Sequence, residues 1–75
     1  MKAKFQQLVL CLHNAGYVVS LERRKIYRAL PDAAANREGL IRVIDESGND
    51  YLYPAEWFAP LMLPAALRKA VLAVA

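Results

Sequence analysis

Cysteine and histidine are almost missing from this 75-residue chain, which has one of each, Cys11 and His13. A single cysteine excludes a disulfide within the chain, and the two residues together are too few to form a structural zinc site. A single domain of this size buries only about 60% of its unfolded surface. Its stability must therefore come from apolar packing or from self-association.

Long apolar runs and glycine-rich segments are also missing. The three glycines are dispersed, so no glycine loop can cradle a phosphate. No run approaches the roughly 20 apolar residues of a membrane-spanning helix. Gln6 and Gln7 interrupt the short apolar stretch near the N-terminus, so we expect neither a signal peptide nor a lipid anchor. The sequence predicts a cytoplasmic protein with a reduced thiol and no membrane partner.

Positively charged residues only slightly outnumber negatively charged ones. The formal net charge is +3 and the hydrophobic fraction is 57%. A mildly basic chain permits a nucleic-acid or acidic partner without requiring one. The hydrophobic fraction is high for a small chain, which indicates apolar surface left for a partner or a second copy.

The clearest structural signal is a β-hairpin in residues 39–54. Leu40–Ile44 is an apolar, β-branched run broken only by Arg42, and residues 51–53 are aromatic and apolar. Between them, residues 45–50 supply the glycine and asparagine that adopt the positive φ of hairpin turns.

A two-residue turn at residues 47–48 or 48–49 is expected to join these strands, and both turns give the same division into faces. The purely apolar face is expected to point into the core: Ile41, Val43, Leu52 and Pro54. The mixed face is expected to point outward: Arg42, Ile44, Tyr51 and Tyr53. We expect Asp45 and Asp50 to bond to the backbone of the turn.

Further elements are expected on both sides of the hairpin. Strands are expected at residues 7–13, 25–30 and 59–63, an extended segment at 17–19, and a loop at 20–24. Residues 33–38 form either one helical turn or a loop, and residues 54–58 read as a helical turn with Pro54 in first position.

Two prolines mark the end of the chain. Pro60 predicts that the last strand lies on a sheet edge. Pro64 is expected to open a helix, Ala65–Val74, with Leu63, just before it, Leu67 and Val71 on one stripe. We expect this stripe to dock on the barrel or on the matching helix of a second copy, because an isolated helix of this length is marginal.

Short strands, tight turns and a helical turn before the last strand predict a mainly β fold. Residues 25–30, 39–45 and 51–54, with Phe58, resemble small uncharacterised bacterial proteins that have a Src-homology-3-like barrel. The resemblance covers residues 8–63 and implies the fold without an established activity. We therefore expect one domain over residues 1–75: a small Src-homology-3-like barrel at 7–63 and a short C-terminal helix at 64–75.

A second resemblance concerns Src-homology-3 domains themselves. Pro54 and Trp57, with the two residues between them, are similar to the proline, helical turn and aromatic residue of that family. The resemblance implies a groove for proline-rich peptides. Residues 20–25 are basic where that family has an acidic, aromatic-rich loop, so we do not expect binding of that kind.

The outward face of the expected sheet is the main candidate site. Planar rings beside guanidinium groups suit a protein interface or nucleobase stacking. The alternative is a solvated strand face in which these side chains only cover the barrel. The candidate residues are Arg28, Arg42, Tyr51 and Tyr53.

Catalytic and metal chemistry find little support in the sequence. Cys11 and His13 would share a strand face, but no further ligand or base completes a site. Residues 45–56 fit a calcium-loop template in part, with Asp50 where glycine is needed. We expect a non-enzymatic protein-interaction module without cofactor or metal. The alternatives are nucleic-acid binding through the Arg and Tyr face, and a structural homo-oligomer, such as a homodimer joined by the apolar C-terminus.

Overall fold

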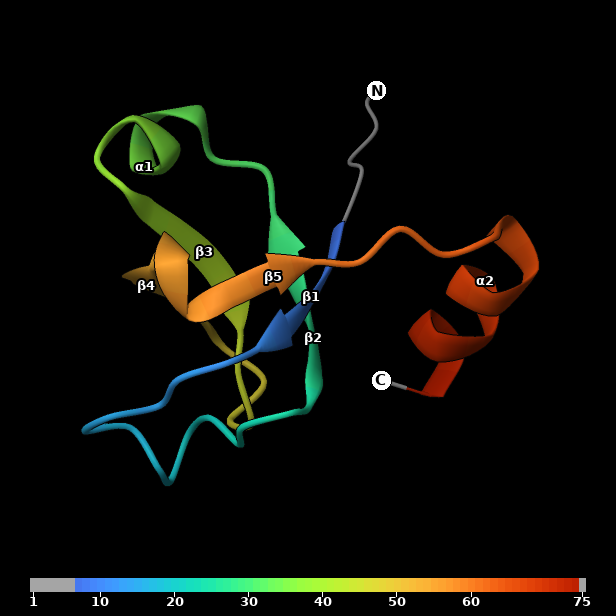
Figure 1. Ribbon diagram of the computed structural model, residues 1–75, viewed down its shortest axis with the longest axis horizontal. Coiled ribbons are helices and arrows are strands. Elements are labelled where there is room, and N and C mark those ends of the chain that lie inside the picture. The colour runs from blue at the N-terminus through green and yellow to red at the C-terminus, as the bar shows by residue number, and fades with distance from the viewer. Residues whose placement is uncertain (1–6, 75) are drawn as a thin grey trace.

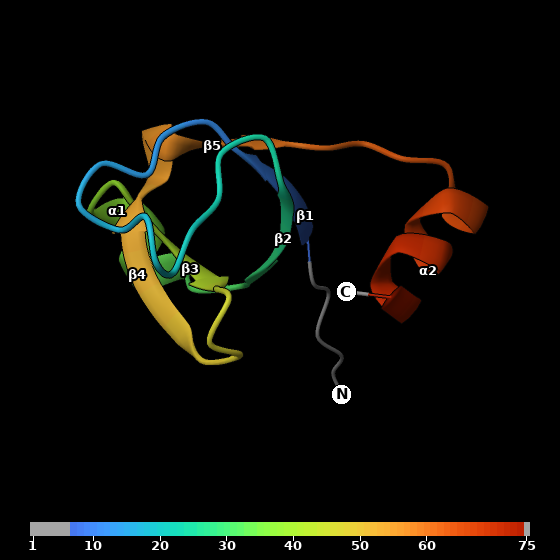
Figure 2. The same cartoon turned by 90° about the horizontal axis from the view of Figure 1, so that it is seen from below.

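The computed structural model describes residues 7–74, in which a five-stranded antiparallel sheet curls into a half-barrel (Figures 1 and 2). The strands are β1 (Gln7–Cys11), β2 (Ile26–Leu30), β3 (Leu40–Ile44), β4 (Asp50–Pro54) and β5 (Phe58–Pro60). The helices are α1 (Ala33–Arg37), the 3₁₀ turn η1 (Ala55–Trp57) and α2 (Ala65–Val74). The predicted class is confirmed: the fold is mainly β and consistent with a small Src-homology-3-like barrel.

The strands lie in the order β4-β3-β2-β1-β5, so β4 and β5 form the edges. Pro60 lies in β5, as predicted for an edge strand, because proline has no N–H to donate to a further strand. The strand β5 is shorter than expected and begins one residue earlier, at Phe58. Residues 61–64 are not in a strand but connect β5 to α2.

Side chains on the inner face of the sheet form the core. Strand alternation brings Val9 beside Tyr27 and Ala29 beside Val43 across neighbouring strands. Leu21, from the loop between β1 and β2, is also fully buried. The core cluster consists of Val9, Cys11, Leu21, Tyr27, Ala29, Val43, Tyr53 and Phe58.

The connection between β2 and β3 contains a short helix, which is one of the two alternatives, helical turn or loop, that the sequence allows. The Asp32 carboxylate accepts the backbone N–H of Ala35 at 2.9 Å and so caps α1. After the helix, Gly39 has a φ of +77°, which places the chain in the left-handed region that glycine tolerates and returns it to the sheet.

The long connection between β1 and β2 differs from the expected extended segment at residues 17–19. The carbonyl of Tyr17 accepts N–H groups from Ser20 and Leu21, so this segment is a turn. Residues 20–24 form a loop, as expected. Figure 1 places this connection and the β3–β4 turn at the same end of the half-barrel, away from α1.

The predicted hairpin is confirmed, but its predicted register is wrong. Ile44 pairs with Asp50, so residues 45–49 lie outside the ladder instead of two residues. Gly48 donates its N–H to the Asp45 carbonyl and has a φ of +86°, which is a turn followed by a left-handed residue and a bulge. This change in loop length turns β4 over relative to β3.

Because of this register, each side chain of β4 lies on the face of the sheet opposite to the predicted one. Tyr53 pairs with Ile41 and is buried in the core, with 2% of its surface exposed. Leu52 pairs with Arg42 on the outer face and is 42% exposed. Val43 is fully buried, as expected. The predicted inward position of Leu52 and outward position of Tyr53 are both wrong.

Helix α2 begins after Pro64, as expected, and lies beside the half-barrel in both views (Figures 1 and 2). Leu67 is 56% exposed, so this residue does not dock on the chain's own barrel, whereas Val71 is partly buried. Among residues 7–74, no helix has the length and apolar character needed to cross a membrane.

Candidate interaction face

The two arginines of the predicted site lie on the outer face of β2 and β3. Arg28 pairs with Ile44, and Arg42 pairs with Leu30 two positions along the ladder. The Arg42 Nε atom lies 2.8 Å from Asp32 Oδ2, and its Nη1 atom lies 3.0 Å from Asp50 Oδ2. Two carboxylates therefore compensate the charge of this guanidinium.

The two tyrosines of the predicted site lie on the opposite face of the sheet. Tyr53 belongs to the core, while Tyr51 is 52% exposed because it lies near the turn. The four residues predicted to share one surface are therefore split between the two sides. The cause is the five-residue segment 45–49, which reverses the faces of β4.

Trp57, from the predicted groove, joins an aromatic cluster that the sequence did not predict. Its ring stacks at 26° on Tyr53, with centroids 6.4 Å apart, and meets Tyr17 at 5.7 Å. Pro54 directly precedes η1 and has a φ of −57°, which proline readily adopts. The aromatic cluster is Tyr17, Tyr53, Trp57 and Phe58.

Tyr17 is the residue that sequence reasoning missed. Its ring lies 5.2 Å from that of Tyr53 at an angle of 89°, an edge-to-face arrangement that stabilises aromatic pairs. The signal in the sequence was an aromatic residue directly after the turn glycine, Gly16. The sequence predicts an extended segment here, because spacing along the chain does not show that this turn folds back to Trp57.

A pocket opens between the turn at Tyr17 and the β3–β4 hairpin. We call it the tyrosine pocket; its volume is about 380 Å³. One acid and three tyrosines are among its lining residues, and no lysine or arginine is. The lining is Tyr17, Ser20, Asp45, Ser47, Tyr51, Leu52 and Tyr53.

Asp45 is the buried charge of the tyrosine pocket. Its Oδ1 atom accepts the backbone N–H of Ser47 at 2.9 Å and the Ser47 hydroxyl at 2.5 Å. Its Oδ2 atom accepts the Tyr53 hydroxyl at 2.6 Å. Burial raises the pKa of Asp45, but the hydrogen bonds from Ser47 and Tyr53 outweigh it and leave the pKa below its usual value. The expected bonding of Asp45 to the turn backbone is confirmed, whereas Asp50 pairs with Arg42.

A second polar network joins the two walls of this pocket. Glu46 accepts the hydroxyl of Tyr27 at 2.6 Å and lies 2.6 Å from the Lys25 ammonium. The Glu46 N–H donates to the Ser20 carbonyl at 3.0 Å, and the Glu22 N–H donates to the Tyr27 hydroxyl oxygen at 2.7 Å. Burial and the Glu46 carboxylate raise the pKa of Tyr27, so its hydroxyl remains a donor.

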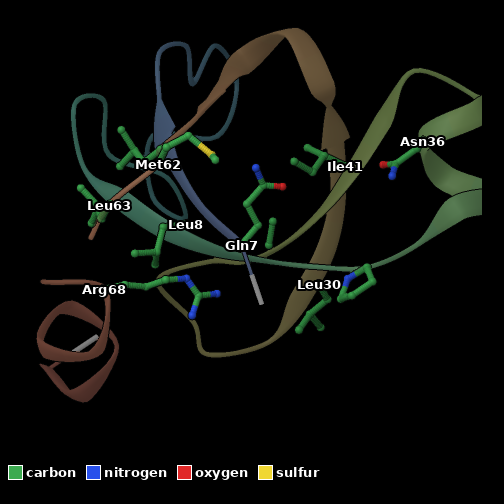
Figure 3. Close-up of a pocket in the computed structure, with 11 residues that line it drawn as sticks. Gln7, Leu8, Leu30, Asn36, Ile41, Met62, Leu63 and Arg68 are labelled. Atoms are coloured by element: carbon green, nitrogen blue, oxygen red, sulfur yellow. The ribbon is translucent and has the colours of Figure 1, made fainter. Parts of the chain in front are cut away.

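A different pocket, of about 570 Å³, lies between the half-barrel and the segment that leads into α2. Figure 3 shows Met62, Leu63 and Arg68 around the same space as Gln7 and Leu8. We call it the apolar pocket. Its remaining lining residues are Ala29, Leu30, Pro31, Asn36, Ile41 and Leu61.

Comparison with protein-family models, with curated proteins and with solved structures finds no match for this chain. Within the described part of the chain, no three His, Cys, Asp or Glu residues are grouped so that they could hold a metal ion. Cys11 is buried and its thiol lies 3.3 Å from the His13 carbonyl. Burial raises the pKa of this thiol.

Proposed function

We propose that this protein is a small non-enzymatic protein-interaction module that binds a segment of another protein at the tyrosine pocket and its rim. The observation that carries the proposal is a run of exposed apolar and aromatic side chains around a concave site. Tyr17, Tyr51 and Leu52 line the pocket and are exposed. Val18 and Val19, in the turn between the lining residues Tyr17 and Ser20, are exposed too, with Val19 at 90%. We call these five residues, together with Trp57, the interaction face.

Composition and order both favour a protein partner. Tyrosine and tryptophan are enriched in protein interfaces because they supply large contact areas at a small cost in conformational entropy. The hydrogen bonds of Asp45 fix the hairpin turn, and the bond from the Glu46 N–H to the Ser20 carbonyl joins this turn to the loop that carries Tyr17. A face already ordered before binding loses less entropy when the partner arrives.

Nucleic-acid binding through Arg28 and Arg42 is the weaker proposal. The Arg42 guanidinium is held by two carboxylates, and the Lys25 ammonium is held by Glu46. Phosphate contacts would have to compete with these ion pairs. The tyrosines expected to stack on bases lie on the other side of the sheet.

Self-association is supported by a separate observation. Met62 lines the apolar pocket and is 90% exposed, and Leu67, next to the lining residue Arg68, is 56% exposed. A second copy could bury these side chains. Light scattering over a concentration series would reveal such a dimer, and exposed Met62→Ser would weaken it.

Selection of random peptides displayed on phage tests the interaction face. Enriched peptides are titrated against the purified protein by fluorescence, since Trp57 is the single tryptophan. We expect Tyr17→Ala to weaken their binding at least tenfold and Met62→Ser, an exposed control elsewhere, to leave it unchanged. Circular dichroism checks the fold of both variants.

Two results would contradict the proposal. One is a set of peptides that bind wild type and Tyr17→Ala equally well; the other is a failure to enrich any peptide that depends on the interaction face. A parallel titration with mixed-sequence DNA and RNA tests the alternative, because phosphate contacts give affinity that falls steeply with salt.

A further inference from the structure

The tyrosine pocket is acidic, although the chain as a whole is basic. The protein carries a net charge of +3, yet the only ionisable acid or base in the lining besides tyrosine is Asp45. Three tyrosines share the pocket with this carboxylate. Aromatic faces and a nearby negative charge attract cations, and they repel phosphate and carboxylate groups.

We infer that the tyrosine pocket binds an alkylammonium group, with Tyr17 and Tyr51 as aromatic walls and Asp45 as the buried counter-charge. The inference rests on the proposed function, because it assigns the group to a lysine side chain of the partner protein. A small quaternary ammonium compound has the same chemistry, and the test separates the two sources.

The geometry of the walls suits a compact cation. The rings of Tyr17 and Tyr53 meet edge to face at 89° with centroids 5.2 Å apart, and this contact fixes the orientation of the Tyr17 ring at the pocket. Tyr51 lies two residues before Tyr53 and therefore on the same side of β4. The volume of about 380 Å³ lies in the range of small-ligand sites.

The hydrogen bonds of Asp45 specify the kind of ammonium group. Both carboxylate oxygens already accept bonds, from the Ser47 N–H and hydroxyl and from the Tyr53 hydroxyl. These three bonds leave one acceptor position, on Oδ2, so a primary ammonium could place at most one of its three N–H groups on Asp45. A methylated ammonium needs no acceptor, because its charge interacts with the ring faces and the carboxylate through space. We therefore expect affinity to rise with methylation.

The test is a titration of the isotope-labelled protein with matched small molecules, followed by nuclear magnetic resonance. The cationic molecules are tetramethylammonium, choline and the amides of lysine and Nε-trimethyllysine; the neutral control is 3,3-dimethyl-1-butanol, which has the shape of choline without its charge. We expect shifts at residues 45–53 and an upfield shift of the N-methyl protons, caused by the aromatic rings. The neutral molecule should bind about tenfold more weakly than choline.

Two variants of the exposed Tyr51 give a matched pair. Tyr51→Leu keeps an apolar side chain but removes the ring, and should weaken binding of trimethyllysine amide about threefold to tenfold. Tyr51→Phe keeps the ring and should bind like wild type. Asp45→Asn should weaken binding of the cations and not of the neutral alcohol; if Asp45→Asn does not fold, the Tyr51 pair still decides.

The source of the ammonium group is tested with a lysine-containing peptide in unmethylated and trimethylated form. Tighter binding of the trimethylated peptide than of choline supports a protein partner. Equal binding of choline and its neutral analogue, or equal binding by Tyr51→Leu and Tyr51→Phe, would overturn the inference. Peptides that depend on Tyr17 but contain no lysine would overturn it and leave the proposed function standing. Binding of choline with no peptide binding would retain the pocket chemistry and contradict the proposed function.

Discussion

The two pockets of this protein differ in the parts of the chain that form their walls. The tyrosine pocket is built on the half-barrel, where Asp45 and Glu46 are hydrogen-bonded to three other segments of the chain. Their carboxylates accept the hydroxyls of Tyr53 and Tyr27, and the Glu46 N–H donates to the Ser20 carbonyl. The apolar pocket takes one wall from residues 61–68, which lead away from the barrel into a ten-residue helix. The difference indicates that polar networks fix the first site, whereas the second depends on a helix with little packing of its own.

The largest expected effect is that of Tyr53→Ala. This change removes a buried ring from the core and leaves the Asp45 carboxylate without one of its donors. We expect a loss of about 3–5 kcal/mol in the free energy of unfolding, measured by urea denaturation. The matched change in α2, Leu67→Ala, should stay within about 0.5 kcal/mol, because Leu67 is exposed. Equal effects of the two changes would remove the contrast between barrel and helix.

The next comparison tests the register of the hairpin. Val43 and Leu52 were expected to share the core, but only Val43 is buried. Val43→Ala should lower the free energy of unfolding by roughly 1–3 kcal/mol, while Leu52→Ala should lower it by less than about 1 kcal/mol. Thermal melting of the two variants measures both. A larger effect at Leu52 would restore the two-residue turn and contradict the observed faces.

A smaller effect should appear on acidification. The pKa of Asp45 in the folded protein lies below its usual value, so the carboxylate stabilises the fold above the unfolded pKa of about 3.9. This contribution is lost as the pH falls through the folded pKa. We expect it to be on the order of 1–2 kcal/mol.

Urea unfolding at pH 7 and at pH 3 measures this contribution. Wild type should lose more stability between the two pH values than Asp45→Asn, which has no proton to bind at that position. The pKa values of Asp32 and Glu46 are also lowered, so both proteins should keep some acid dependence. Identical losses in the two proteins would show that Asp45 does not contribute.

The sequence predicted most elements of the fold but not the packing of the hairpin. Strand patterns, prolines and the glycine turn located β2, β3, the turn η1 and helix α2. The faces of β4 were missed because loop length sets the register, and Gly48 fits both a two-residue turn and the longer turn with a bulge. The backbone hydrogen bonds from Gly48 to the Asp45 carbonyl and from Asp45 to the Asn49 carbonyl distinguish the two.

The candidate site was less predictable than the fold. The sequence predicts two of its tyrosines, Tyr51 and Tyr53, as functional candidates, but on the wrong face of the sheet. Tyr17 was missed because its contact with Trp57 spans 40 positions of the chain and depends on how the loop between β1 and β2 folds back. Pairing of Arg42 with Asp32 and Asp50 also depends on tertiary structure, which periodicity does not encode.

The smallest expected effect is that of removing residues 65–75. The sequence favours a clear loss of stability, since Leu67 and Val71 form one stripe and a short helix needs docking. In the structure Leu67 is exposed and Val71 is only partly buried, so we expect a loss below about 1 kcal/mol in thermal melting. The tyrosine pocket should keep its ligand affinity, because the two pockets have no lining residue in common and residues 65–75 do not line the tyrosine pocket. Light scattering of the full-length and the truncated protein tests this expectation. A full-length dimer that becomes a monomer on truncation, with a large concentration-dependent loss of stability, would show that α2 docks on a second copy. The contrast between the two regions would then hold only for the isolated chain.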